Sequence, residues 1–141
     1  MAILTSTLRP QIKRRLRNEY IVWLTTVGSD LTPQPRPVWF IWDAAQGSFL
    51  IYSQPNAHKV RHLIKHPKVA LHFNADETAD QDVLVFIGTA RIDPDASPAH
   101  KVPAYLKKYR DGIAGLDMTP EQLSIEYSTA IRVKPTSMRE G

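Results

Sequence analysis

Cysteine is absent from this 141-residue sequence, and no apolar run approaches the length of a membrane-spanning helix. The absence of cysteine excludes disulfides, thiolate metal sites and cysteine nucleophiles. A spanning helix needs about 20 consecutive apolar residues, so we expect no membrane association. The first ten residues also lack the charged-then-apolar pattern of a secretion signal. We therefore expect a cytoplasmic protein.

Motifs that mark common catalytic classes are also missing. The sequence contains no glycine-rich dinucleotide fingerprint and no phosphate-loop lysine motif. No serine elbow motif and no pair of carboxylates stands out. A Rossmann domain and a nucleophilic hydrolase therefore lack support, and we name no catalytic residue.

What is present is an ordinary globular composition with a basic balance. Hydrophobic residues make up 43% and charged residues 23% of the chain, and the net charge is +4. A chain of this length suits one domain, so we expect residues 1–141 to form a single domain. The positive charge reflects a solvated surface or favours an anionic partner. Because basic and aromatic residues do not alternate on a predicted sheet face, we do not expect that partner to be nucleic acid.

Hydrophobic periodicity predicts six strands and several helices. Leu8, Ile12 and Leu16 form one stripe of a helix over residues 8–18. Apolar, β-branched runs predict strands over 20–27, 38–42, 49–52, 69–73, 83–92 and 130–133, the first buried on both faces and the last ending at Pro135. Helices are predicted near 102–109 and after a capping box at 119–122, and an exposed acidic hairpin loop over 76–82. This order predicts a mainly β (α+β) fold, an antiparallel barrel decorated by helices.

A further short helix is predicted in the segment YSQPNAHKVRHLIKHP, residues 52–67. Residue types that begin helices stand at its start, namely Ser53, Pro55 and Asn56. Lys59 then falls in or near the first turn, where the free N–H groups already make the helix end positive. An anion bound between Lys59 and the helix end explains this placement. A solvated lysine that weakens the helix slightly is the other interpretation.

Prolines alternate in the segment TPQPRPVWFIW, residues 32–42. They cannot donate ladder hydrogen bonds, so this strand lies at an edge, or its neighbour is a loop or a ligand. A flat aromatic cofactor could lie along the backbone of Val38 and Trp39, with its phosphate reaching Arg36 and Lys59. An ordinary barrel strand whose edge is protected by prolines is the alternative.

Three histidines, His58, His62 and His66, fall at four-residue intervals on the short helix. Two such histidines could hold a metal ion. Basic residues crowd the same segment, at positions 59, 61, 65 and 68, and no acidic residue offsets them. We therefore expect no metal site there.

Together these segments resemble the pyridoxamine-5′-phosphate-oxidase-like, FMN-binding split-barrel proteins, and among them the subgroup that depends on the deazaflavin coenzyme F420. The resemblance is carried by VWLTTV (22–27), PQPRPVWFIWD (33–43), IYSQPNAHKVRHLIKHPKVALHF (51–73), VPAYLKKYRDGIAGLDMTPEQ (102–122) and IRVKPTSMR (131–139). It implies a six-stranded antiparallel split β-barrel that forms a homodimer, with FMN or F420 in two clefts at the subunit interface. It also implies hydride transfer between the cofactor and a small-molecule substrate, with no protein acid or base required.

The resemblance further implies which residues bind the cofactor. They are Arg36, Pro37, Val38 and Trp39 on the second strand, Tyr52 and Ser53 at the end of the third, and the phosphate-binding Lys59, with His58 in place of the usual basic residue before it. The partner-chain ligands and the C-terminal substrate segment of true pyridoxamine-phosphate oxidases have no match in this sequence. The resemblance therefore does not extend to oxidation of pyridoxamine 5′-phosphate.

Two other functions share these features. A cofactor-binding or storage protein without turnover would carry the same residues, and an assay with reduced cofactor separates the two. Related split barrels bind haem, and here His72 or His100 would have to serve as the axial ligand.

Overall fold

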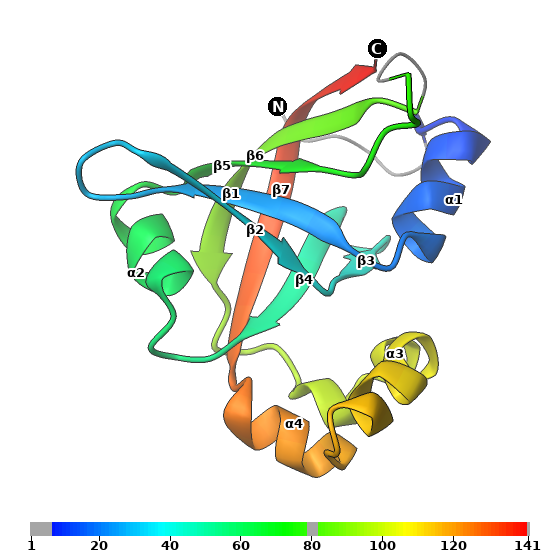
Figure 1. Cartoon of the computed structure of the whole chain (residues 1–141), viewed down its shortest axis with the longest axis vertical. Coiled ribbons are helices and arrows are strands. Elements are labelled where there is room, and N and C mark those ends of the chain that lie inside the picture. The colour runs from blue at the N-terminus through cyan, green and yellow to red at the C-terminus, as the bar shows by residue number, and fades with distance from the viewer. Residues whose placement is uncertain (1–6, 79–81, 141) are drawn as a thin grey trace.

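The computed structural model describes residues 7–78 and 82–140. Its strands form one antiparallel sheet in the order β2-β1-β5-β6-β7-β4-β3, which curls into a half-barrel (Figure 1). The strands are β1 (Val22–Val27), β2 (Pro33–Val38), β3 (Ile41–Asp43), β4 (Ser48–Ser53), β5 (Lys68–His72), β6 (Leu84–Ile92) and β7 (Thr129–Glu140). The helices are α1 (Pro10–Asn18), α2 (His58–Lys65), α3 (Pro103–Gly115) and α4 (Pro120–Glu126), with a short 3₁₀ helix, η2 (Ala99–Lys101).

The mainly β fold is confirmed, but the expected strand over 38–42 is wrong and the sheet has seven strands in place of six. β2 ends at Val38 and pairs with β1 at one edge of the sheet, whereas β3 begins at Ile41 and pairs with β4 at the opposite edge. Trp39 and Phe40 carry the chain from one edge to the other. The alternating prolines lie inside β2, which is an edge strand as their missing N–H groups predict.

The two faces of the sheet differ in burial. Along β1, alternate residues are buried and half-buried, because side chains point to opposite faces in turn. The prediction that this strand is buried on both faces is therefore wrong for the single chain. The half-buried residues of β1 lie on the outer face of the sheet, where Trp23 is paired with His72 of β5.

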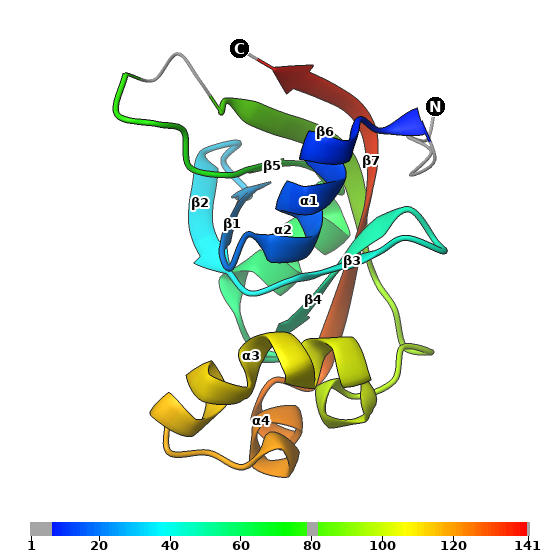
Figure 2. The ribbon, with the colours of Figure 1, turned by 90° about the vertical axis from the view of Figure 1, so that its right-hand side faces the viewer.

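Two hydrophobic clusters hold the molecule together. The first fills the half-barrel and includes Leu8, Ile12 and Leu16. The predicted helix begins at Pro10 and not at Leu8, so Leu8 is buried just before α1 and only Ile12 and Leu16 lie on it. The second lies between β4 and helices α3 and α4, where Tyr52 packs with residues such as Tyr109. Figure 2 shows α1 lying across the half-barrel, with α3 and α4 stacked below it.

Helix starts were predicted with mixed success. The Thr119 capping box is confirmed, because the Thr119 side chain accepts from the Gln122 N–H while the Gln122 side chain accepts from the Thr119 N–H. The expected start of α2 at Ser53, Pro55 or Asn56 is wrong. Ala57 precedes the helix with no side-chain hydrogen bond, because Ser53 is still the last residue of β4.

The last strand is longer than predicted and continues past Pro135 to Glu140. β4 pairs with β7 only as far as Val133, whereas β6 pairs with β7 up to Glu140. Beyond Val133, β7 therefore has a neighbouring strand on one side only, which allows Pro135, with no N–H to donate, to lie within it. A register shift between Ile87 and Gly88 accommodates this segment. Residues 79–81 of the expected acidic loop lie outside the described residues. In the described part of the chain, no helix has the length and apolar content that crossing a membrane requires.

Candidate functional site

The fold brings two cations together, Arg36 on β2 and Lys59 in the first turn of α2. β2 is an edge strand, so only one of its sides is paired, with β1. Burial, and then the nearby charge of Arg36, lower the pKa of Lys59. Neither cation forms an ion pair with a carboxylate among the described residues. Two neighbouring cations at a helix start, with no acid to neutralise them, are suited to bind an anion.

Helix α2 is held against β1 by packing and by one polar contact. Val60 and Leu63 are buried, with 7% and 1% of their surface exposed. His62 Nδ1 lies 3.1 Å from the hydroxyl of buried Thr26 on β1. These contacts fix the first turn of α2 beside the edge of the sheet, and with it Lys59.

His58, directly before Lys59, is exposed and is contacted by Arg61. Arg61 donates to His58 Nδ1 at 2.6 Å and to the carbonyl of Asn56 at 2.9 Å. A guanidinium only donates hydrogen bonds, so it is the donor in both contacts. Arg61 therefore holds the His58 ring beside the helix start.

Tyr52 and Ser53 end β4 where the chain turns toward α2. The Tyr52 hydroxyl donates to the carbonyl of Ser97 at 2.6 Å, and burial raises the pKa of Tyr52 to about 12. The Ser53 hydroxyl donates to the carbonyl of Gln54 at 3.0 Å, and its residue is 1% exposed. Both hydroxyls thus have partners within the chain, and the role of these residues toward a cofactor stays a prediction.

Trp39 is positioned by helix α3, a relationship that the sequence reasoning missed. Its ring stacks on Tyr109 with centroids 4.6 Å apart and planes 10° apart, and it meets the edge of Tyr20 at 6.0 Å. A Cβ at Gly112 would lie 2.9 Å from the Trp39 ring, so glycine is required for this close approach. The aromatic spacing in 102–109 predicts a buried helix face, but no local signal links it to Trp39.

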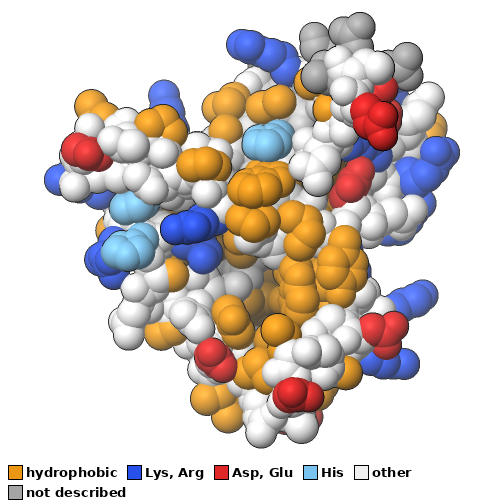
Figure 3. All heavy atoms as spheres, viewed as in Figure 1, with side chains coloured by type: hydrophobic (Ala, Val, Ile, Leu, Met, Phe, Trp, Pro, Cys, Tyr) orange, Lys and Arg blue, Asp and Glu red, His pale blue; other side chains and the backbone are white. Residues whose placement is uncertain are grey.

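Figure 3 shows that the surface is hollowed between the half-barrel and helices α3 and α4. Hydrophobic side chains surround the hollow, and Lys, Arg and His side chains gather on its left in this view (Figure 3). The structure thus combines, on one face, an apolar concave surface with basic groups beside it. A flat ring that carries an anionic tail has matching chemistry.

The three histidines, His58 and His62 of α2 and His66 directly after it, do not converge. The His58 and His62 rings are 6.2 Å apart, and His66 Nε2 is buried with no hydrogen-bond partner. Across residues 7–78 and 82–140, the structure holds no group of three or more side chains placed to bind a metal.

The two histidines considered as haem ligands lie on different elements. His72 lies on β5, its ring parallel to that of Trp23. His100 Nδ1 lies 2.8 Å from the Ser124 hydroxyl, which leaves only its second ring nitrogen for a ligand.

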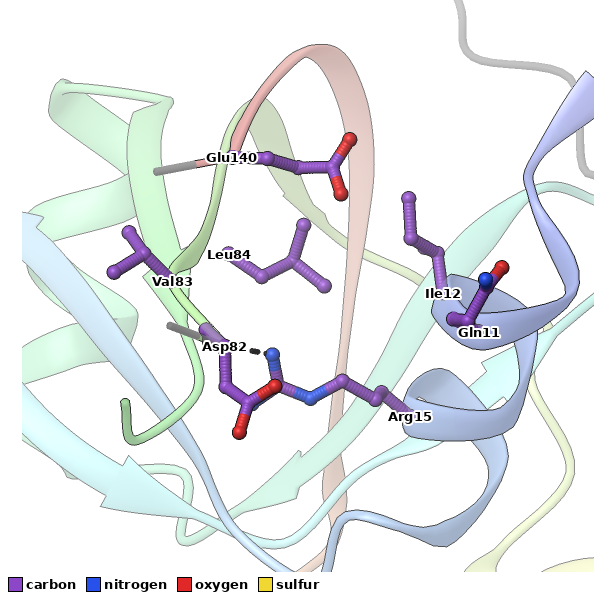
Figure 4. Close-up of a pocket in the computed structure, with 7 residues that line it drawn as sticks. All are labelled: Gln11, Ile12, Arg15, Asp82, Val83, Leu84 and Glu140. Atoms are coloured by element: carbon purple, nitrogen blue, oxygen red, sulfur yellow. Dashed lines mark hydrogen bonds between the residues drawn. The ribbon is translucent and has the colours of Figure 1, made fainter. Parts of the chain in front are cut away.

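A small notch of about 150 Å³ between α1 and the ends of β6 and β7 contains none of the predicted site residues (Figure 4). Arg15 crosses it to donate to the carbonyls of Asp82 at 2.6 Å and Asn74 at 3.0 Å. Glu140 on the far side forms an ion pair with Arg9. These contacts hold α1 against the ends of the strands, so we interpret the notch as part of the packing between α1 and the sheet and not as a ligand site.

The curled antiparallel sheet, with one edge strand feeding directly into the other, defines a split β-barrel. The sequence profile of the family described as "Pyridoxamine 5'-phosphate oxidase" matches residues 8–140. The chain belongs to this family.

Solved structures with the same fold differ in what their names say they do. A protein named "F420 Reductase" superimposes with a TM-score of 0.66 at 24% identity over 92% of this chain and 96% of its own. A conserved hypothetical protein from Mycobacterium tuberculosis gives a TM-score of 0.72 at 19% identity, over 94% and 83%. The heme storage protein HutZ from Vibrio cholerae gives 0.65 at 20% identity, over 94% of each chain. At these identities the similarity establishes the fold alone. No curated protein matches this chain in sequence.

Proposed function

We propose that this chain binds a phosphate-bearing flavin or deazaflavin, FMN or coenzyme F420, and acts with it as an oxidoreductase on a small organic substrate. The observation that carries the proposal is the pairing of Arg36 with Lys59 beside the open edge of β2. Burial, and then the nearby charge of Arg36, lower the pKa of Lys59, so the charged lysine is disfavoured in the chain alone. A phosphate between them would favour the charged lysine and add charge-assisted hydrogen bonds.

The surrounding residues fit the same group. The side of β2 away from β1 has no neighbouring strand, so the backbone groups that point to that side can contact a ring, and stacking on Tyr109 keeps Trp39 in place at the end of the strand. His58 lies next to Lys59, held by Arg61, and its second ring nitrogen would contact the same phosphate. The bound cofactor would supply hydride transfer, while the protein binds and orients it.

The proposal includes a homodimer, because the outer sheet face is apolar and uncovered in the single chain. Two cross-strand rows run over β1, β5 and β6 in register: Trp23, His72 and Val85, then Thr25, Ala70 and Ile87. Ile87 is 42% exposed, and hydrophobic side chains cluster over these strands (Figure 3). Pairing this face with the same face of a second chain would remove it from water.

Titration of the purified protein with FMN, F420 and haemin tests the cofactor. We expect saturable binding of FMN or F420, seen as a shift in the cofactor's own absorbance or fluorescence. Sedimentation should give a dimer of the 16.0 kDa chain. A Soret band with no flavin or deazaflavin binding would instead favour the haem function, and a stable monomer with bound cofactor would contradict the dimer.

Turnover is tested separately from binding. Reduced cofactor bound to the protein should be reoxidised faster by an organic acceptor than the same cofactor free in solution. Tight binding with no acceleration across a panel of quinones and unsaturated carbonyl compounds would favour the storage function.

A further inference from the structure

A groove with a volume of about 850 Å³ separates α1 and β3 from α3. Figure 2 shows α1 above β3 and α3 below it. The lining residues are Lys13, Leu16, Arg17, Asn18, Tyr20, Ile41, Trp42, Ala44, Ala104, Lys107 and Lys108. This volume lies in the range of small-molecule sites, about 300–1,000 Å³.

Two helices present matching stripes to the groove. Lys13 and Arg17 are four residues apart on α1, and Lys107 and Lys108 follow Ala104 by three and four residues on α3. Residues at these spacings share one face of a helix. Because Ala104 has a small side chain, it leaves space in the groove between the lysines of α3 and the basic residues of α1.

The walls of the groove are basic, and no acidic residue is among those that line it. In the described part of the chain, neither Lys13, Arg17 nor Lys107 forms an ion pair. The half-buried carboxylate of Glu19, two residues after Arg17, is bound to Arg15 at 3.0 Å. The groove therefore has an unbalanced positive charge that favours an anion.

Lys108 is held in place before any ligand arrives. Its ammonium donates to the carbonyl of Phe40 at 3.1 Å and lies 3.7 Å from the centroid of the Phe40 ring. An ammonium fixed in this way has less side-chain entropy to lose when an anion binds.

The floor of the groove is apolar and partly open to water. Tyr20 is 42% exposed, and Ile41 and Trp42 of β3 are half-buried. Hydrophobic surface of this kind gains free energy when an apolar body covers it. The floor and walls together select a molecule with an apolar body and a negative charge.

We infer that the groove between α1, β3 and α3 binds an organic carboxylate with a flat apolar body. Its lining shares no residue with the proposed cofactor site, so either proposal can fail while the other holds. The apolar body would lie on Tyr20 and Trp42, and the carboxylate would reach the ammonium groups of Lys107 and Lys108.

Calorimetric titration with 2-naphthoate tests this inference. We expect one site per chain, and at least about tenfold weaker binding of the neutral alcohol with the same ring system. The double variant Lys13→Gln/Lys107→Gln should weaken binding by about tenfold. Lys65→Gln, an exposed lysine on α2, should not change it. Ala104→Phe should fill the groove and abolish binding, with circular dichroism confirming that the variant is folded.

Equal affinities for the carboxylate and the alcohol would overturn the inference, as would unchanged binding to the double variant. Absence of binding to the wild-type protein would also overturn it. This includes the case in which a second copy of the chain covers the groove and so prevents naphthoate from entering. FMN or F420 titration of the same variants should match the wild type. The failure of naphthoate binding is thus distinguishable from a failure of the cofactor proposal.

Discussion

The hydroxyl of Tyr109 lies 2.8 Å from the backbone nitrogen of Phe40 and 3.0 Å from its carbonyl oxygen. The phenol accepts from the buried N–H and can donate to the carbonyl of Phe40 or, at 2.8 Å, to that of Tyr20. Phe40 stands where the chain leaves β2 and crosses to β3. The Tyr109 side chain of α3 therefore fixes the crossover between β2 and β3. This crossover positions Trp39 where the edge strand β2 ends, at the candidate site.

Tyr109→Phe should lower the free energy of unfolding by about 1–3 kcal/mol, because it leaves the buried N–H of Phe40 without an acceptor. Urea denaturation measures the change. Tyr127→Phe is the matched control, because Tyr127 is half-buried and the hydrogen bond that joins it to a described residue is made by its backbone N–H to Leu123, not by its hydroxyl. We expect a change below ~0.5 kcal/mol. Similar losses in both variants would show that the hydroxyl does not hold the crossover.

Gly112→Ala should destabilise the protein although alanine favours helices. The new Cβ would lie 2.3 Å from the Tyr20 hydroxyl and 2.9 Å from the Trp39 ring. We expect a loss of about 1–3 kcal/mol and a shift in tryptophan fluorescence. Gly115→Ala meets nothing within 4 Å, so it should be neutral or stabilise by up to ~1 kcal/mol. Stabilisation by both alanines would contradict the close packing at Gly112.

Lys59→Ala should weaken binding of FMN or F420 by about 1.5–3 kcal/mol, the range for a hydrogen bond to a charged group. Arg36→Ala should act in the same direction, and the double variant should lose less than the sum, because both cations contact one phosphate. Lys65→Ala on the same helix serves as control. Equal dissociation constants for Lys59→Ala and the wild type would exclude the phosphate role.

Asp93→Asn should remove part of the acid sensitivity of the fold. Arg132 Nε donates to the Asp93 carboxylate at 2.8 Å, and this hydrogen bond lowers the pKa of Asp93 below its ordinary 3.8. A lowered carboxyl pKa contributes stability that is complete above the ordinary value and is lost as the pH falls through the folded value. The variant should therefore be less stable at neutral pH, yet lose less on acidification. Asp95→Asn, at an exposed position, should follow the wild-type profile in thermal melts.

Binding of 2-naphthoate in the groove should weaken as the pH rises past 8. Burial lowers the pKa of Lys108 to about 8, and above this value its ammonium becomes neutral. Glu19 acts in the opposite direction, while Lys13, Arg17 and Lys107 also line the groove.

Between pH 7 and pH 9 we expect about a fivefold loss of affinity, equivalent to ~1 kcal/mol for one nearby charge. Lys108→Arg keeps its charge over this range, so its affinity should stay level. A parallel decline in wild type and variant would assign the pH dependence to another group.

Much of the candidate site could be predicted from the sequence because its signals are local. The prolines around Arg36 remove backbone donors and so predict an edge strand, and a lysine in the first turn of a helix is electrostatically unfavourable unless an anion is near. The capping box at Thr119 is likewise contained within one turn of helix, and Ile12 and Leu16 lie one turn apart on α1.

What only the tertiary structure decided depends on residues distant in the chain. The apolar run over 38–42 looks like one strand. In the structure the Tyr109 hydroxyl accepts a hydrogen bond from the Phe40 N–H, and the run is divided between β2, which ends at Val38, and β3, which begins at Ile41. The hydroxyl of Tyr52 looks free for a ligand until Ser97 is placed beside it. The groove between α1 and α3 exists only once the helices are packed. Local patterns reflect the geometry of a single helix or strand, whereas hydrogen-bond partners and cavities depend on which distant segments the folded chain brings together.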